Sequence, residues 1–323
     1  MNARADWNSP SEPGAEFDIG AIVGELHQAR TRWRESQRRR QEIGGRELPS
    51  REALAGIVAS LSAALFPMRL GPPDLRQESE DFFVGHTLDV ALHALRTQVR
   101  LELGHQTRLN RALVDIDRPS LDIVRAFGAS LGRLRVLLDT DVLAAFHGDP
   151  AARSVDEVLI CYPGVRAMIH HRIAHELHRL GVPLLARIVS ELSHAETGID
   201  IHPGATIGAG FFIDHGTGAV IGETAEIGRN VRLYQAVTLG ARRFATDAQG
   251  QLVKGGARHP VVEDDVVIYA GATLLGRITI GKGSTIGGNV WLTRSVPPGS
   301  HVAQAQAREG IEAEVGGRDG DGI

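Results

Sequence analysis

Four polar residues of the stretch Gly198–Gly218 have types and spacing that suit proton transfer. Asp200 and His202 lie near its start, and Asp214 and His215 lie near its end. A histidine side chain titrates near neutral pH and is therefore a natural general base, while a carboxylate on its second ring nitrogen fixes the tautomer and stabilises the imidazolium. The stretch predicts a histidine base with an aspartate partner.

His215 has two candidate partners. Asp214 is adjacent, but successive side chains on a strand point to opposite faces. Asp200 lies fifteen residues earlier, three short of one turn of the repeat described below, so we expect it in the neighbouring turn near the same corner. We therefore favour Asp200. The same three residues would equally cap tight turns, and spacing alone does not separate the two interpretations.

A second polar group, Arg258-His259, follows later in the chain. An arginine offers a planar fork to a carboxylate or a phosphate, although an arginine in a loop is more often simply solvated. Small residues at Gly240, Ala270 and Gly288 would let a thin, extended ligand lie against backbone amides. Small residues are equally what tight corners accept.

The element that must position these residues is a repeat of six. Aliphatic residues recur at every sixth position, a period that suits neither an α-helix nor an ordinary strand. The first run is Ile201, Ile207, Ile213, Ala219, Ala225, Val231 and Val237, and the second is Val262, Ile268, Leu274, Ile280, Ile286 and Leu292. We expect a left-handed parallel β-helix, an exception to the right-handed crossover rule, with three hexads in each coil.

The predicted β-helix spans residues 198–303. Between its two runs, residues 241–260 are polar and rich in glycine, as expected of a loop that leaves a solenoid at one corner. Residues 304–323 have few apolar side chains and are predicted to form a flexible tail.

Residues 17–197 have the pattern of an all-helical domain, so the fold class is α+β. Ser50 is a suitable N-cap for a helix that stops at Pro67, Pro119 stands in the first turn of another, and Asp149-Pro150 has the types of an N-cap and first helical residue. A first helical pattern begins at Phe17. Further helices are expected over about 51–66, 81–103, 119–138, 164–180 and 184–195. Residues 1–16 are expected to be disordered.

Composition favours a cytoplasmic protein. The chain has a formal net charge of −4, one cysteine and 42% hydrophobic residues. This charge gives no reason to expect a nucleic-acid partner. A single cysteine favours a reducing compartment. No apolar run is as long as a membrane span, which needs about 18 residues. Four histidines between residues 164 and 180 lack the HExxH pattern, so no metal site is predicted there.

A resemblance to the serine O-acetyltransferases of cysteine biosynthesis rests on the run DIHPGATIGAGFFIDHGTGAVIGETAEIG, followed by VTLGA, GARHP and GATLLGRITIGKGSTIGGNVWLTRSVPP. The likeness covers about Asp149 to Pro298. It implies a homotrimer, or a dimer of trimers, that transfers acetyl from acetyl-coenzyme A to the hydroxyl of L-serine without a metal.

The resemblance also assigns roles to single residues. It implies that His215 is the base and Asp200 its partner. Two carboxylates would hold the amino group of serine, and an arginine with a histidine beside it would hold the carboxylate: Asp149, Asp214, Arg258 and His259. The coenzyme A groove between adjacent subunits would be lined by Gly240, Ala270 and Gly288.

The C-terminal residues Gly-Asp-Gly-Ile, ending at Ile323, resemble the peptide by which some members of this family enter the active site of O-acetylserine sulfhydrylase, a case of peptide capture by a terminal carboxylate. The sequence departs from the commoner pattern in three places. It has DHGTG for DHATG, a longer loop before Arg258, and VAQAQ for the usual GVPA segment. Inhibition by cysteine and the C-terminal edge of the groove therefore stay open.

Three other functions share parts of this pattern. A hexapeptide acetyltransferase for a sugar or homoserine would keep the coils and the histidine base. A zinc hydratase on the same coils would need three convergent histidines, and His202, His215 and His259 lack the expected spacing. A non-catalytic scaffold would only display its tail to a partner.

Overall fold

The computed structural model describes residues 17–37, 47–110, 115–243, 247, 249–253 and 255–304. The chain divides into two compact units, residues 1–47 and 48–323. The first unit contains α1 (Ile19–Ser36), where Asp18 caps the helix by accepting a hydrogen bond from the amide of Ala21 at 2.9 Å. The predicted disorder of residues 1–16 and most of the predicted tail fall outside the described residues.

The predicted helical region is confirmed. Its helices are α2 (Arg51–Leu65), α3 (Pro67–Leu70), α4 (Glu80–Asn110), α5 (Asp117–Gly148), α6 (Val155–Cys161), α7 (Pro163–Arg179) and α8 (Pro183–Thr197), with a short 3-10 helix η1 (Gln77–Ser79) before α4. Ser50 caps α2 as predicted, since its hydroxyl accepts a hydrogen bond from the amide of Ala53. Pro67, Pro163 and Pro183 begin their helices at positions where a missing N–H costs nothing.

Asp149 does not begin a helix, so the N-cap interpretation is wrong. Helix α5 runs ten residues beyond the predicted end at Leu138, and Asp149 is its C-cap. The apolar face of α5 continues through the buried Val142 and Ala145, which explains the longer helix. The carboxylate of Asp149 instead accepts a hydrogen bond from the amide of Ala151 at 2.8 Å and stabilises the turn that leads to α6.

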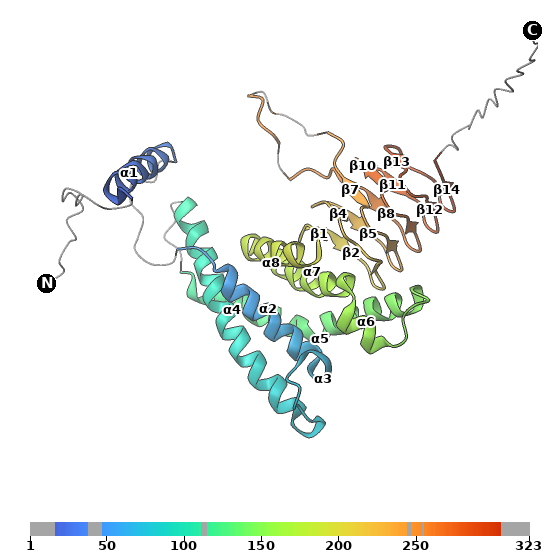
Figure 1. Ribbon diagram of the computed structural model, residues 1–323, viewed down its shortest axis with the longest axis horizontal. Helices are drawn as coiled ribbons and strands as arrows, with labels where there is room; N and C mark the ends of the chain where they lie inside the picture. Colours follow the sequence, from blue (N-terminus) through green and yellow to red (C-terminus); the bar gives the residue numbers. More distant parts are fainter. Residues whose placement is uncertain are drawn as a thin grey trace, which may run out of the picture. The chain divides into compact units, whose positions relative to one another are not determined.

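After α8 the chain winds into three parallel sheets (Figure 1). Sheet A contains β1 (Asp200–Ile201), β4 (Val220–Ile221), β7 (Thr238–Gly240), β10 (Thr273–Leu275) and β13 (Trp291–Leu292). Sheet B contains β2 (Thr206–Ile207), β5 (Glu226–Ile227), β8 (Val261–Val262) and β11 (Thr279–Ile280). Sheet C contains β3 (Phe212–Ile213), β6 (Arg232–Leu233), β9 (Val267–Ile268), β12 (Thr285–Ile286) and β14 (His301–Val302). Consecutive strands move from sheet to sheet around a prism, as the left-handed β-helix requires.

The unbroken six-residue register is wrong at one point. Ile213 is followed by Ile221 at the next strand position, and β1 pairs with β4 in the register Asp200↔Val220, so the first coil has two extra residues. The predicted Ala219 is also fully buried, but it occupies a second inward position two residues before the strand aliphatic. The extra residues lie in the turn between β3 and β4, which carries His215. The second run, from Val262 to Leu292, is confirmed.

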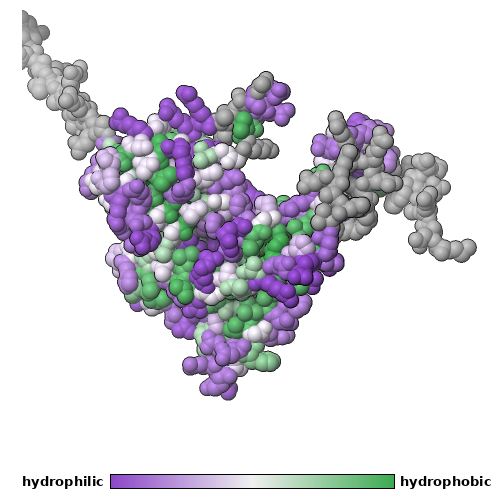
Figure 2. Space-filling model, turned by 180° about the vertical axis from the view of Figure 1, so that it is seen from behind, coloured by the Kyte–Doolittle hydropathy of each residue, from purple (hydrophilic) through white to green (hydrophobic). Residues whose placement is uncertain are grey.

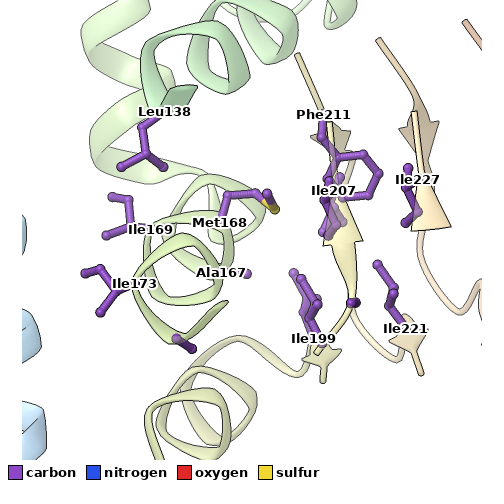
Figure 3. Close-up of a cluster of buried hydrophobic side chains, with 14 of the residues drawn as sticks. Leu138, Ala167, Met168, Ile169, Ile173, Ile199, Ile207, Phe211, Ile221 and Ile227 are labelled. Carbon is purple, nitrogen blue, oxygen red and sulfur yellow. The ribbon is translucent and has the colours of Figure 1, made fainter. Parts of the chain in front are cut away.

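A buried ion pair and an apolar cluster join the helices to the first coils. The guanidinium of Arg172 on α7 bonds both carboxylate oxygens of Asp141 on α5 at 3.0 and 3.1 Å and also donates to the carbonyl of Gly208 at 2.6 Å. Asp141 in turn accepts from the amide of Phe211 at 2.9 Å. Figure 3 shows the apolar cluster, with Met168 reaching toward the strands. The helices are therefore held at a fixed position against β3.

The surface of the described chain mixes hydrophilic and hydrophobic side chains on the face drawn in Figure 2. Isolated exposed apolar residues are normal on a folded protein. None of the described helices is long and apolar enough to cross a membrane.

Candidate active site

The turn between β3 and β4 presents His215 to solvent. His215 has a φ of +58° and is followed by Gly216 at +86° and Gly218 at +75°. A Cβ on Gly216 would stand 2.5 Å from Ile199, so only glycine fits there. The side chain of His215 is 73% exposed. A left-handed backbone in a non-glycine residue is uncommon and is kept where surrounding contacts require it, and here it directs the ring outward.

Asp214 lies beside His215 but is nearly buried, with a side chain 11% exposed. One carboxylate oxygen accepts a hydrogen bond from Arg232 on β6 at 2.5 Å, and the other lies 3.9 Å from Nε2 of His215. The guanidinium of Arg232 is 4.9 Å from the ring centroid of Phe212 and 4.6 Å from that of Tyr234. Asp214 is thus a carboxylate held between a cation and the histidine.

Asp149 approaches the same place from the end of α5. A Cβ on the preceding Gly148 would stand 2.9 Å from Phe212, so this end of the helix lies directly against β3. The hydroxyl of Tyr162 donates to the carboxylate of Asp149 at 2.5 Å. This bond lowers the pKa of Asp149, with smaller contributions from the Ala151 amide and the positive charge of Arg232, and it raises the pKa of Tyr162 to about 12.

Together, these residues form what we call the base corner, the edge between sheets C and A that contains His215, Asp214, Asp149, Arg232 and Tyr162. It combines an exposed imidazole with two carboxylates. Such a set can accept a proton from a bound hydroxyl and hold an ammonium group next to it.

Asp200, the favoured partner of His215, lies on β1. Its backbone amide donates to the carbonyl of Ala219 at 2.9 Å, and its side chain is partly exposed. Among the described residues, no hydrogen bond or ion pair joins its carboxylate to His215. The choice of Asp200 over Asp214 assumed a coil without extra residues, and the first coil has two. The role of Asp200 stays a prediction.

Arg258 and His259 lie at a second edge, between sheets A and B. The guanidinium of Arg258 pairs with the carboxylate of Glu223. The ring of His259 is buried, and its Nδ1 accepts from the amide of Thr224 at 3.1 Å, so in the neutral ring the proton is on Nε2. A Cβ on Gly222 would stand 2.0 Å from this ring. The motif Gly222-Glu223-Thr224 therefore contacts and holds Arg258 and His259. We call these five residues the anion corner.

Electrostatics keep His259 neutral. Burial, together with the positive charge of Arg258, lowers the pKa of His259 to about 4. Arg277 lies on the same side and donates to the carbonyls of Thr224 and His259 at 2.8 and 3.2 Å. Burial also lowers the pKa of His202, whose Nδ1 accepts from the amide of Gly204 at 3.0 Å. His202 is thus a structural residue beside the anion corner.

The two corners are separated within one chain by sheet A. The small residues divide between them. Ala270 and Gly288 lie in successive coils on the base side, where a Cβ on Gly288 would stand 3.2 Å from the carbonyl oxygen of Ala270. Gly240 ends β7 on the anion side, with Leu275 against it. Ile323 lies outside the described residues.

Comparison with known proteins identifies the family. The chain is 58% identical over 265 residues to the serine acetyltransferase, plasmid, of Synechococcus elongatus, an alignment that covers 81% of this chain and 83% of that protein. The chain belongs to the serine acetyltransferase family. It is also 51% identical over 162 residues to the serine acetyltransferase of Mycobacterium tuberculosis, covering 50% of this chain and 67% of that one. The bacterial transferase hexapeptide (six repeats) family model matches residues 259–294.

Solved serine acetyltransferases have the same fold. Isoform 3 from Entamoeba histolytica, in complex with cysteine, matches with a TM-score of 0.67 and 34% identity over 80% of this chain and 84% of that chain. The enzyme of Neisseria gonorrhoeae, in complex with serine, matches with a TM-score of 0.51 and 28% identity over 78% of this chain and 95% of that chain. In the described part of this serine acetyltransferase, no three His, Cys, Asp or Glu side chains converge as a metal site would require.

Sequence reasoning missed several residues of both corners. Glu223 and Thr224 stood inside the family motif GETA, but only the fold shows that they hold Arg258 and His259. Arg232 occupied an ordinary outward position of a hexad, and the correct coil length was needed to place it next to Asp214. No signal in the sequence indicated Tyr162, because its contact with Asp149 depends on the path of the chain between α5 and α7.

Proposed function

We propose that this serine acetyltransferase transfers acetyl from acetyl-coenzyme A to the hydroxyl of L-serine and so forms O-acetyl-L-serine for cysteine biosynthesis. The base corner carries this proposal, because it places His215 beside two carboxylates in a chain whose family is established. A sugar acceptor has no ammonium group to occupy the space between Asp149 and Asp214. Serine carries one next to its hydroxyl.

In this mechanism His215 removes the proton of the serine hydroxyl while the oxygen attacks the thioester carbonyl. Backbone amides along the coil stabilise the tetrahedral oxyanion. The intermediate collapses by breaking the carbon–sulfur bond, and the coenzyme A thiolate takes the proton from His215. Asp200 orients the imidazole in this proposal. No cysteine nucleophile is required, and the only cysteine, Cys161, lies at the end of α6, in the helical region.

The anion corner completes the site from a neighbouring subunit of a cyclic trimer. Arg258, with His259 beside it, would bind the carboxylate of serine, yet within one chain sheet A stands between it and His215. A heterologous contact brings different surfaces of two copies together. Exposed apolar side chains on sheet A support such a contact, because Val220 is 36% and Trp291 69% exposed.

The same contact would place Gly240 of one subunit opposite Ala270 and Gly288 of the next, with the coenzyme between them. We further propose that trimers work in the cytoplasm, in line with the single cysteine. The tail that ends at Ile323 would dock in O-acetylserine sulfhydrylase, its carboxylate replacing that of the amino-acid substrate.

The decisive experiment replaces the base. General-base assistance contributes about 10²–10⁴-fold, so His215→Ala should lower turnover by that order while the protein stays folded. Release of free coenzyme A is measured with serine, homoserine and a sugar as acceptors. His194→Ala is the matched control, because His194 is exposed on α8 and outside both corners. Equal turnover in His215→Ala and wild type would refute the assignment, and preference for a sugar would refute serine as the substrate.

A further inference from the structure

We infer that Arg232 is a specificity-determining residue that acts through Asp214: it holds this carboxylate in place so that the site recognises the ammonium group of its acceptor. The inference rests on the proposed function, in which Asp149 and Asp214 hold that ammonium. Arg232 itself is a positioning residue, since its contacts are with protein groups.

The setting of Arg232 distinguishes it from a surface arginine. It stands on β6 at the outward position paired with Phe212 on β3, and its side chain is 25% exposed. Its guanidinium carbon lies 4.9 Å from the ring centroid of Phe212 and 4.6 Å from that of Tyr234. A planar guanidinium stacks well on aromatic faces, where a lysine ammonium lacks the matching shape. The two rings thus restrict the positions that the guanidinium can take beside Asp214.

One nitrogen atom of Arg232 indicates that the contact with Asp214 sets the position of the guanidinium. Its Nε is buried and has no hydrogen-bond partner among the described residues. Leaving a buried donor unpaired is unfavourable, so the side chain is not arranged to satisfy its own hydrogen bonds. It is arranged so that one terminal nitrogen reaches the carboxylate of Asp214 at 2.5 Å.

Asp214 needs this cation. A carboxylate that is 11% exposed is costly to keep charged without a partner. The negative charges of Asp149, Glu157 and Asp214 all raise the pKa of Tyr162, so three carboxylates gather in this region. Arg232 offsets this like-charge crowding. Without it, the carboxylate of Asp214 would lose its fixed position, and the proposed ammonium site would lose one of its two carboxylates.

The test compares Arg232→Met with wild type in steady-state kinetics. Loss of one charge-assisted contact to the ammonium site should raise the KM for serine about tenfold or more, while kcat and the KM for acetyl-coenzyme A change much less. Arg232→Lys restores the charge without the fork and should recover part of the loss. Arg229→Met is the matched control, since Arg229 belongs to the same coil but pairs with Asp264 away from the base corner.

A second acceptor separates recognition from folding. The hydroxy acid 3-hydroxypropionate resembles serine without the amino group, so kcat/KM for it should be the same in Arg232→Met and wild type. Equal losses for both acceptors would mean a structural role and would overturn the inference. An unchanged or lower KM for serine would overturn it as well. Wild type is assayed with serine before any variant is made. If it fails to acetylate serine, the proposed function itself is wrong.

Discussion

His171 on α7 is a buried histidine whose two ring nitrogens have no hydrogen-bond partner within the described residues. Burial, assisted by the positive charge of Arg172, lowers its pKa well below the usual value. The folded protein therefore binds fewer protons at this site than the unfolded chain does. Stability from this difference is present above about pH 6.5 and is lost as the pH falls below it.

His171→Leu should make the protein less sensitive to acid. One histidine that titrates only when unfolded accounts for about 2 kcal/mol of the stability lost between pH 7 and pH 5, and the variant should lose about that much less. At pH 7 the change should be near neutral, since leucine leaves no polar group unpaired. Urea unfolding at both pH values and one protein concentration measures this. An unchanged pH dependence would show that His171 finds a partner in solution.

At the scale of single residues, the sequence suggested candidate site residues but not most of their contacts. The residue types suggested His215 as a base and Arg258 as a ligand for an anion, whereas the roles of Asp214 and Arg258 toward serine came from the family resemblance. The contacts of Tyr162 and Arg232 were not predictable, because each depends on segments far apart in the chain. Hexad spacing predicts the face of the prism on which a side chain lies. It does not predict the contacts that make that side chain part of a site.

At the scale of elements, the prediction of helices followed by hexad coils is confirmed, but the register was lost at the turn that carries His215. Each hexad has two inward positions, and both accept small apolar side chains. Ala219 and Ala225 therefore continued the six-residue pattern although the strands had moved by two residues. A two-residue insertion is invisible to a periodicity argument when either frame can fill the core.

The joint between α5, α7 and the first coils depends on the pair Asp141–Arg172, whose side chains are 1% and 4% exposed. Asp141→Ala should cost about 3–5 kcal/mol of unfolding free energy, because it leaves a buried guanidinium unpaired. It also removes the acceptor of the Phe211 amide. Chemical denaturation measures the loss. Asp139→Ala, which removes an exposed i,i+4 partner of Arg135 on α5, is the control and should cost under about 1 kcal/mol.

Removing both charges tests whether pairing is the cause. In Asp141→Leu with Arg172→Met no charge is left unpaired, so part of the loss should return. Recovery stays incomplete because the carbonyl of Gly208 and the amide of Phe211 lose their partners. If the double variant is less stable than wild type by the sum of the losses in Asp141→Leu and Arg172→Met alone, the two residues act independently and the ion pair does not explain the joint.

At the scale of the whole molecule, the central observation is that one chain carries His215, the proposed base, and Arg258, the proposed carboxylate ligand, on different edges of the prism. Sequence order could not reveal this, because Arg258 belongs to the loop 241–260 between the two hexad runs, and hexad spacing does not fix the edge at which that loop rejoins the coil. The triangular section of the coil separates them. In the proposed mechanism a complete serine site therefore requires a second copy, and the trimer is a condition of catalysis.

Mixed trimers test that requirement directly. His215→Ala and Arg258→Ala chains should each be nearly inactive alone, because every site in either assembly lacks one group. If a site takes its base corner from one chain and its anion corner from the next, co-expression in equal amounts leaves about one quarter of the sites intact by random association. Activity should then return to about a quarter of wild type. Pairing His215→Ala with Asp149→Ala, two changes in one corner, should give no recovery, and activity that stays at background in the first mixture would place both corners in a site within a single chain.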